Sequence, residues 1–112
     1  MTKVSQLQSS LNKHQFNAWE TKSLGTVYQA LTDGFVVVSF VPVLANEDLR
    51  LVGQTDSNNP PTIVRVTVYT GLGGHNESFT MPVRKGDYWK IASVGVATPS
   101  NISIYWIGTN TQ

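Results

Sequence analysis

The 112-residue chain contains no cysteine, and only 13% of its residues are charged. The absence of cysteine excludes disulfide cross-links, thiolate metal sites and thiol catalysis. The charged fraction is about half of the usual share, and serine, threonine, asparagine and glutamine take its place. We therefore expect a polar but weakly charged surface that makes its contacts through hydrogen bonds.

The chain also lacks any concentration of positive charge. Its formal net charge is +1, and its eight lysines and arginines are spread from Lys3 to Lys90. Nucleic-acid-binding proteins usually carry a basic stripe that neutralises phosphates, so nucleic acid is not an expected partner. No apolar run reaches the ~20 residues of a membrane helix, and the first residues lack the apolar centre of a signal peptide. We expect a soluble domain that is made in a cytoplasm and does not insert into membranes.

The N-terminal segment has a different pattern from the rest of the chain. Val4, Leu7 and Leu11 occupy positions a, d and a of a heptad frame. Two heptads are too few to specify a coiled coil, so a helical stem and an irregular tail both remain open. We assign residues 1–24 to a stem or linker segment and residues 25–112 to a single domain.

From residue 25 onward the pattern is that of short strands separated by turns. Apolar and β-branched runs recur at close spacing, with Gly, Asp, Asn and Pro between them. No stretch leaves room for a crossover helix, which excludes a parallel α/β sheet. The pattern predicts about eight strands in an all-β sandwich or jelly roll. The expected strands are 26–31, 35–44, 49–52, 63–69, 78–83, 88–92, 94–97 and 102–107, with 53–61 as a loop.

Residues 35–44 (Phe-Val-Val-Val-Ser-Phe-Val-Pro-Val-Leu) are apolar at nearly every position. Because successive strand side chains point to opposite faces, this strand presents apolar groups on both sides. One face meets the core of the sandwich, and the other is available to a second subunit. Val37 and Phe40 are the candidate interface residues on this strand.

Two adjacent aromatic pairs, Tyr88-Trp89 and Tyr105-Trp106, lie on expected strands. The same alternation requires one member of each pair to leave the core. An exposed apolar patch is unusual on a monomer, so a subunit contact is expected, with Trp89, Tyr105 and Trp106 as further interface candidates. In a monomeric carbohydrate-binding module, Trp89 and Trp106 would instead be the first candidates for stacking on a sugar.

No constellation of catalytic or metal-binding residues stands out. His14 and His75 lie far apart, and neither belongs to a cluster with metal-ligand spacing. Most of the seven carboxylates fall in expected turns and do not indicate the facing pair of a glycosidase. The glycine-rich stretch 71–74 lacks the Lys-Ser/Thr of a phosphate loop, and no nucleophile elbow occurs. We expect a non-enzymatic protein with no metal and no cofactor.

Three stretches carry a resemblance to a known family. They are Tyr-Gln-Ala-Leu-Thr-Asp-Gly-Phe-Val-Val-Val at 28–38, Phe-Thr-Met-Pro-Val-Arg-Lys-Gly-Asp-Tyr-Trp-Lys at 79–90 and Ile-Tyr-Trp-Ile at 104–107. Together they resemble the distal tip (knob or head) domains of trimeric tailed-bacteriophage fibres and tail needles. The resemblance implies a jelly roll like that of tumour necrosis factor, assembled as a homotrimer on a helical stem. It also implies location in the virion and a role in host cell-surface attachment or penetration.

In such a tip, the loops farthest from the stem would meet a bacterial glycan or protein receptor. Two long polar loops, 56–59 and 73–77, are the candidates because they tolerate variation. Their receptor-facing candidates are Asp56, Ser57, Asn58, Asn59, His75, Asn76 and Glu77.

Three alternatives to the attachment tip remain open. They are a structural capsid-decoration or head-fibre protein, a monomeric carbohydrate-binding module, and an endoglycosidase or depolymerase. A trimer that buries aromatic residues between its subunits would favour the attachment tip or the decoration protein. A monomer with an open aromatic face would favour the carbohydrate-binding module.

Overall fold

The computed structural model describes residues 15–40, 50–69, 76–94 and 102–110. No helix among these residues is long and apolar enough to cross a membrane. They form the strands β1 (Gln15–Lys22), β2 (Tyr28–Gln29), β3 (Gly34–Phe40), β4 (Arg50–Asp56), β5 (Val64–Tyr69), β6 (Glu77–Val83), β7 (Tyr88–Val94) and β8 (Ile102–Asn110).

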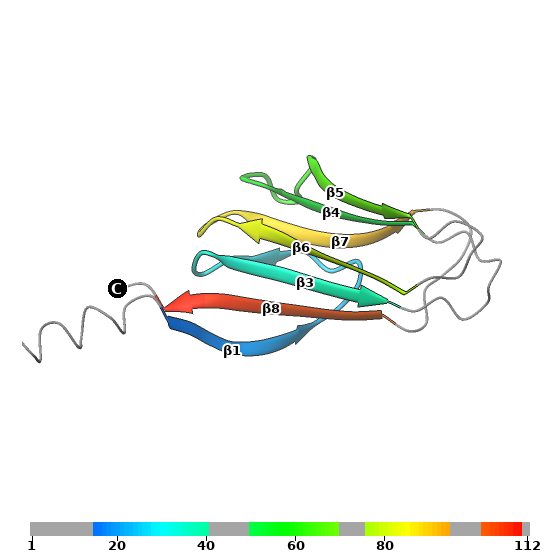
Figure 1. Cartoon of the computed structure of the whole chain (residues 1–112). Helices are drawn as coiled ribbons and strands as arrows, with labels where there is room; N and C mark the ends of the chain where they lie inside the picture. The colour runs from blue at the N-terminus through cyan, green and yellow to red at the C-terminus, as the bar shows by residue number, and fades with distance from the viewer. Residues whose placement is uncertain (1–14, 41–49, 70–75, 95–101, 111–112) are drawn as a thin grey trace, which may run out of the picture.

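The strands form two four-stranded antiparallel sheets that pack face to face (Figure 1). The first sheet has the order β1-β8-β3-β6, and the second has the order β2-β7-β4-β5. Strands β5 and β6 are edge strands on one side of the sandwich, and β1 and β2 are edge strands on the other. The predicted all-β sandwich is confirmed.

The core lies between the inner faces of the two sheets. In β3 the inward residues Val36, Val38 and Phe40 are at most 2% exposed and alternate with outward residues. Leu51 of β4 and Ile91 of β7, both fully buried, meet them from the second sheet. Removal of these apolar side chains from water is the main stabilising contribution of the sandwich.

Trp106 lies against a pair of glycines in the first sheet. Gly34 of β3 and Gly108 of β8 are direct partners across the strands. A Cβ atom at position 34 would lie 2.6 Å from Cζ2 of Trp106, and one at position 108 would lie 3.2 Å from its Nε1. The indole ring therefore takes the space that two side chains would need. It also stacks on Trp89 of the second sheet, with ring centroids 5.9 Å apart.

The N-terminal boundary of the fold differs from the expectation. Residues 15–22, which we assigned to the stem or linker, form the edge strand β1 and pair with β8 from Gln15↔Asn110 to Lys22↔Ile104. The ladder with β8 satisfies backbone groups along one edge of β1, whereas an isolated helix of two heptads would have no packing partner for its apolar side chains. Residues 1–14 lie outside the described residues.

The loop expected at residues 53–61 begins later than predicted, because β4 continues through residues 53–56. Gly53 is buried, and a Cβ atom there would lie only 2.9 Å from Sδ of Met81. The glycine therefore gives Met81 of the opposite sheet room to approach and does not mark a turn. The predicted strand residues 41–44, 49 and 95–97 lie outside the described residues.

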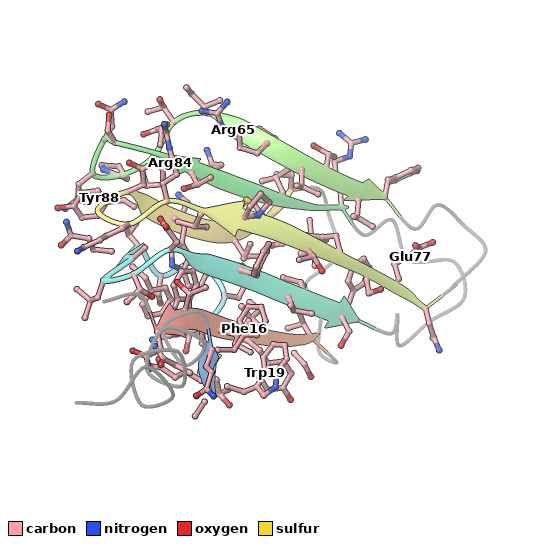
Figure 2. All side chains as sticks on the ribbon, turned by 60° about the vertical axis from the view of Figure 1, so that its left-hand side comes forward. Phe16, Trp19, Arg65, Glu77, Arg84 and Tyr88 are labelled. Atoms are coloured by element: carbon pink, nitrogen blue, oxygen red, sulfur yellow. The ribbon has the colours of Figure 1, made fainter. Side chains whose placement is uncertain are left out.

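The sandwich has two ends that matter for function. Gln15 and Asn110 lie at one end, together with Asp56 and its partner Tyr88; we call it the entry end because β1 begins there. Glu77 lies at the opposite, far end, away from Tyr88 and Arg84 (Figure 2).

Candidate interaction surface

The outer face of the first sheet carries a group of apolar side chains. Trp19 of β1 lies beside Ile107 of β8, and Tyr105 partners Val37 of β3. All of them point away from the core because they alternate with inward residues such as Trp106. We call this surface the outer patch. It consists of Phe16, Trp19, Phe35, Val37, Tyr105 and Ile107.

The side chains of the outer patch contact one another but stay open to solvent. Phe16 and Trp19 are each 58% exposed, and Tyr105 is 37% exposed. The Phe16 and Phe35 rings lie 6.3 Å apart, and Trp19 meets Tyr105 edge to face at 6.2 Å. Figure 2 shows Phe16 and Trp19 close together beside β1. These ring contacts orient the patch and leave much of its apolar surface uncovered on the single chain.

The outer patch carries no charge from its own strands. The charged residues within β1, β3, β6 and β8 are Glu20, Lys22 and Glu77. They are register partners of the inward-facing Trp106, Ile104 and Phe40, so they belong to the opposite face. An aromatic surface depleted of charge is typical of the central part of a subunit interface.

The predicted interface residues divide into two groups. Val37 and Tyr105 lie in the outer patch. Phe40, Trp89 and Trp106 are 2%, 1% and 7% exposed and pack in the core of the single chain, which leaves them too little surface for a contact with a second subunit. In both aromatic pairs the tryptophan enters the core and the tyrosine is the more exposed member, which confirms the predicted alternation.

Phe16 and Trp19 belong to the outer patch, whereas the sequence indicates them only as apolar anchors between the stem and the domain. Their segment had been assigned to the stem. The register of β1 also shifts between these two residues, which marks a β-bulge. The bulge breaks the two-residue period that would have indicated a strand.

Asp56, predicted as a receptor-facing residue, is only 5% exposed and organises the loop that follows β4. Its carboxylate accepts hydrogen bonds from the backbone N–H groups of Asn58 at 2.7 Å and of Thr62 and Ile63 at 2.8 Å each. Burial raises the pKa of Asp56, but these donors outweigh that effect and hold the pKa below its ordinary value. The side chain therefore closes the loop and does not face outward.

The other receptor-facing candidates do not form one surface. Ser57, Asn58 and Asn59 are exposed and follow β4 at the entry end. Asn76 and Glu77 lie at the far end, with Asn76 exposed and Glu77 half-buried. His75 lies outside the described residues. Only one of the two loops can face a receptor that approaches along the long direction of the strands.

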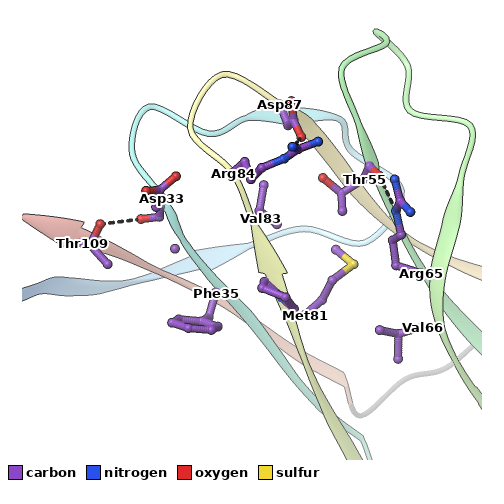
Figure 3. Close-up of a pocket in the computed structure, with 12 residues that line it drawn as sticks. Asp33, Phe35, Thr55, Arg65, Val66, Met81, Val83, Arg84, Asp87 and Thr109 are labelled. Atoms are coloured by element: carbon purple, nitrogen blue, oxygen red, sulfur yellow. Dashed lines mark hydrogen bonds and ion pairs between the residues drawn. The ribbon is translucent and has the colours of Figure 1, made fainter. Parts of the chain in front are cut away.

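A hollow of about 820 Å³ opens near the entry end and is lined by residues of both sheets, including the edge strands β5 and β6 (Figure 3). Its charged side chains are engaged in internal contacts. Nε of Arg84 lies 3.4 Å from Oδ2 of Asp87, and Nε of Arg65 donates to the Thr55 carbonyl at 3.1 Å. Oδ1 of Asp33 accepts the backbone N–H of Lys85 at 2.8 Å. These contacts hold the turns of the entry end in place.

The described part of the chain contains no group of three His, Asp or Glu side chains placed to hold a metal ion. Comparison of the chain with protein-family models, curated proteins and solved structures found no match.

Proposed function

We propose that this chain is the tip domain of a trimeric fibre or tail needle of a tailed bacteriophage. In this proposal three copies assemble through their outer patches, and the far end of the trimer contacts the host cell surface. The observation that carries the proposal is the outer patch. Phe16, Trp19 and Tyr105 form an exposed, uncharged aromatic surface, which is unusual on a monomer and typical of a subunit interface.

The order of the strands supports a jelly roll as the finer description of the fold. From β1 to β8 the chain changes sheet at every connection except the one between β4 and β5. The resulting orders, β1-β8-β3-β6 and β2-β7-β4-β5, agree with two interleaved Greek keys of an eight-stranded jelly roll.

The direction of the chain supports the far end as the receptor-facing end. Strand β1 begins at the entry end, so a stem that precedes Gln15 would attach there. Ser57, Asn58 and Asn59 would then lie beside the stem. Asn76 and Glu77 would point away from it and remain the receptor-facing candidates.

The far end of the second sheet adds exposed groups suited to recognition. Arg50, Tyr69 and Val94 are register partners at this end. Tyr69 is 50% exposed, and the Arg50 guanidinium lies 5.1 Å from the centroid of its ring. Tyrosine and arginine are enriched among the residues that dominate binding energy at interfaces.

Binding to bacterial envelopes tests the proposal. Purified protein is sedimented with isolated cell envelopes from a panel of bacterial strains. We expect wild-type protein to bind envelopes of at least one strain, and Tyr69→Ala to weaken this binding by roughly tenfold. Thr67→Ala, which removes another exposed side chain of β5, serves as the matched control and should bind like wild type.

If wild-type protein binds none of the envelopes, the attachment role is contradicted. A protein that is trimeric but binds no envelope would instead fit the structural decoration or head-fibre role, which requires a subunit interface and no receptor.

A further inference from the structure

A second, smaller pocket opens on the side of the sandwich formed by the edge strands β1 and β2. Its volume is about 270 Å³, slightly below the usual range for sites that bind drug-sized molecules. One wall is an aromatic stack that crosses the two sheets: Tyr28 lies 4.8 Å from Trp89, and Trp89 lies 5.9 Å from Trp106. The pocket is therefore matched in size to a ligand of one ring.

The β-bulge in β1 directs a polar side chain into this pocket. Phe16 pairs with Thr109 and Trp19 pairs with Ile107, so Asn17 and Ala18 together oppose Gly108. Bulges of this kind change the direction of side chains and are frequent beside functional sites. Asn17 is one of the residues that line the pocket.

Three polar groups converge above Gly108. Measured from the place where a Cβ atom at this position would sit, Oγ1 of Thr32 is 2.5 Å away, Nε1 of Trp106 is 3.2 Å away and Nδ2 of Asn17 is 3.4 Å away. These groups come from β8, from β1 and from the turn before β3. The absence of a side chain at Gly108 is what allows them to approach one another.

The pocket retains hydrogen-bonding capacity for a ligand. Trp106 lines the pocket and brings an indole N–H donor to it. Asn17 Nδ2 donates to the Thr109 carbonyl at 3.5 Å, and Gln29 Nε2 donates to the Gly86 carbonyl at 3.2 Å. Each amide keeps a second N–H and a side-chain carbonyl oxygen, so the pocket offers both donors and acceptors.

The charges at the pocket balance each other. Glu20 and Lys22 both line the pocket, and Nζ of Lys22 lies 3.5 Å from Oε1 of Glu20. Lys22 also lies 4.7 Å from the centre of the Tyr28 ring, whose hydroxyl accepts the backbone N–H of Ser23 at 2.9 Å. The aromatic wall is thus held in place before a ligand arrives, and the balanced pair favours a neutral ligand.

We propose that this pocket binds one neutral sugar ring. Sugar hydroxyls both donate and accept hydrogen bonds, as the amides of Asn17 and Gln29 and the indole N–H of Trp106 require. The apolar face of the sugar would pack on Tyr28, the half-buried member of the aromatic stack. The inference rests on the proposed function for the source of the sugar, a glycan of the bacterial surface that would reach this side of the sandwich in addition to the contact at the far end.

Titration of the indole N–H groups by NMR tests this site directly, because the chain has three tryptophans, of which Trp89 and Trp106 line the pocket and Trp19 does not. Glucose, galactose, mannose, rhamnose and N-acetylglucosamine are each added to the full chain up to about 50 mM, which detects a Kd in the millimolar range. We expect at least one sugar to shift the Trp106 signal in a saturable manner while the Trp19 signal stays in place. If none of these sugars moves the Trp106 signal, the sugar site is wrong.

Two variants locate the binding. Asn17→Ala and Gln29→Ala should each raise the Kd by roughly 3- to 10-fold, since each removes a hydrogen-bonding side chain. Gln54→Ala, on the outer face of the second sheet, is the matched control and should titrate like wild type. Equal titration of Asn17→Ala and wild type would place the sugar elsewhere and overturn the proposal.

The mass of the protein in the same samples is also measured, so that failure of the sugar site can be distinguished from failure of the proposed trimer. A trimer without a sugar-dependent shift overturns only the sugar site. A monomer with a saturable shift overturns only the trimer.

Discussion

Asp56 is the residue whose ionisation is most closely tied to the backbone around it. Because its pKa is lowered in the folded protein, the folded state resists protonation more strongly than the unfolded chain. Its stabilising contribution is therefore present above the ordinary carboxyl pKa of 3.8 and is lost as the pH falls below that value through the lowered pKa.

Replacement of Asp56 by Asn should lower the melting temperature at pH 7, because an amide N–H would meet backbone N–H donors of the loop. It should also make the melting temperature less dependent on pH below about pH 4. Circular dichroism melts of both proteins between pH 7 and pH 2 check this. Parallel pH profiles of variant and wild type would show that the carboxylate does not anchor the loop through its charge.

Gly34 is the residue at which a single methyl group should be most disruptive. A Cβ atom there would lie 2.5 Å from the Ile107 carbonyl oxygen and 2.6 Å from the Trp106 ring. We expect Gly34→Ala to lower the free energy of unfolding by about 1–3 kcal/mol, as measured by urea denaturation followed by tryptophan fluorescence. Ser39→Ala, an exposed site on the same strand, should change it by less than about 0.5 kcal/mol. Equal effects of the two substitutions would contradict the close packing of Trp106 on this glycine.

Strand β3 is the element in which the two faces can be separated by mutation. Phe40 points into the core, whereas Val37 lies in the outer patch. A buried unpaired charge costs several kcal/mol, so Phe40→Asp should prevent folding. Val37→Asp should leave the sandwich folded and prevent assembly of the proposed trimer. Circular dichroism together with the mass in solution distinguishes these outcomes, and a folded, trimeric Val37→Asp would remove β3 from the interface.

A strand could be predicted from the sequence where the residues that specify it are close to it in the chain. Strands β3, β6 and β7 could be located from their composition and from the turn residues beside them. Strand β1 could not, because its partner β8 lies at the other end of the described chain and a bulge interrupts the period of β1. The sequence predicts Gly53 as a loop residue. The contact that requires a glycine there is with Met81, which lies on the opposite sheet and far away in the sequence.

The outer patch was predictable only in part, for a related reason. Alternation shows that Tyr105 and Trp106 face opposite sides, but it does not show which of them enters the core. That choice depends on Gly34, which lies on another strand and leaves room for the indole. Asp56 was likewise expected to face outward, because the hydrogen bonds that turn it inward involve the fold of the loop as a whole.

At the scale of the whole molecule, the outer patch, the far end and the sugar pocket have separate locations. The outer patch covers one face of the first sheet, while the pocket opens at the β1 and β2 side. A closed threefold assembly through the patches would gather the three far ends at one tip. The surfaces proposed for assembly and for recognition therefore do not compete for the same residues of one chain.

The mass of the protein in solution is the measurement that decides whether the outer patch is a subunit interface. We would measure it by light scattering on a sizing column at two concentrations. The expected value is three times the 12.3 kDa of one chain, unchanged by dilution. A mass of one chain at both concentrations would contradict assembly through Phe16, Trp19 and Tyr105.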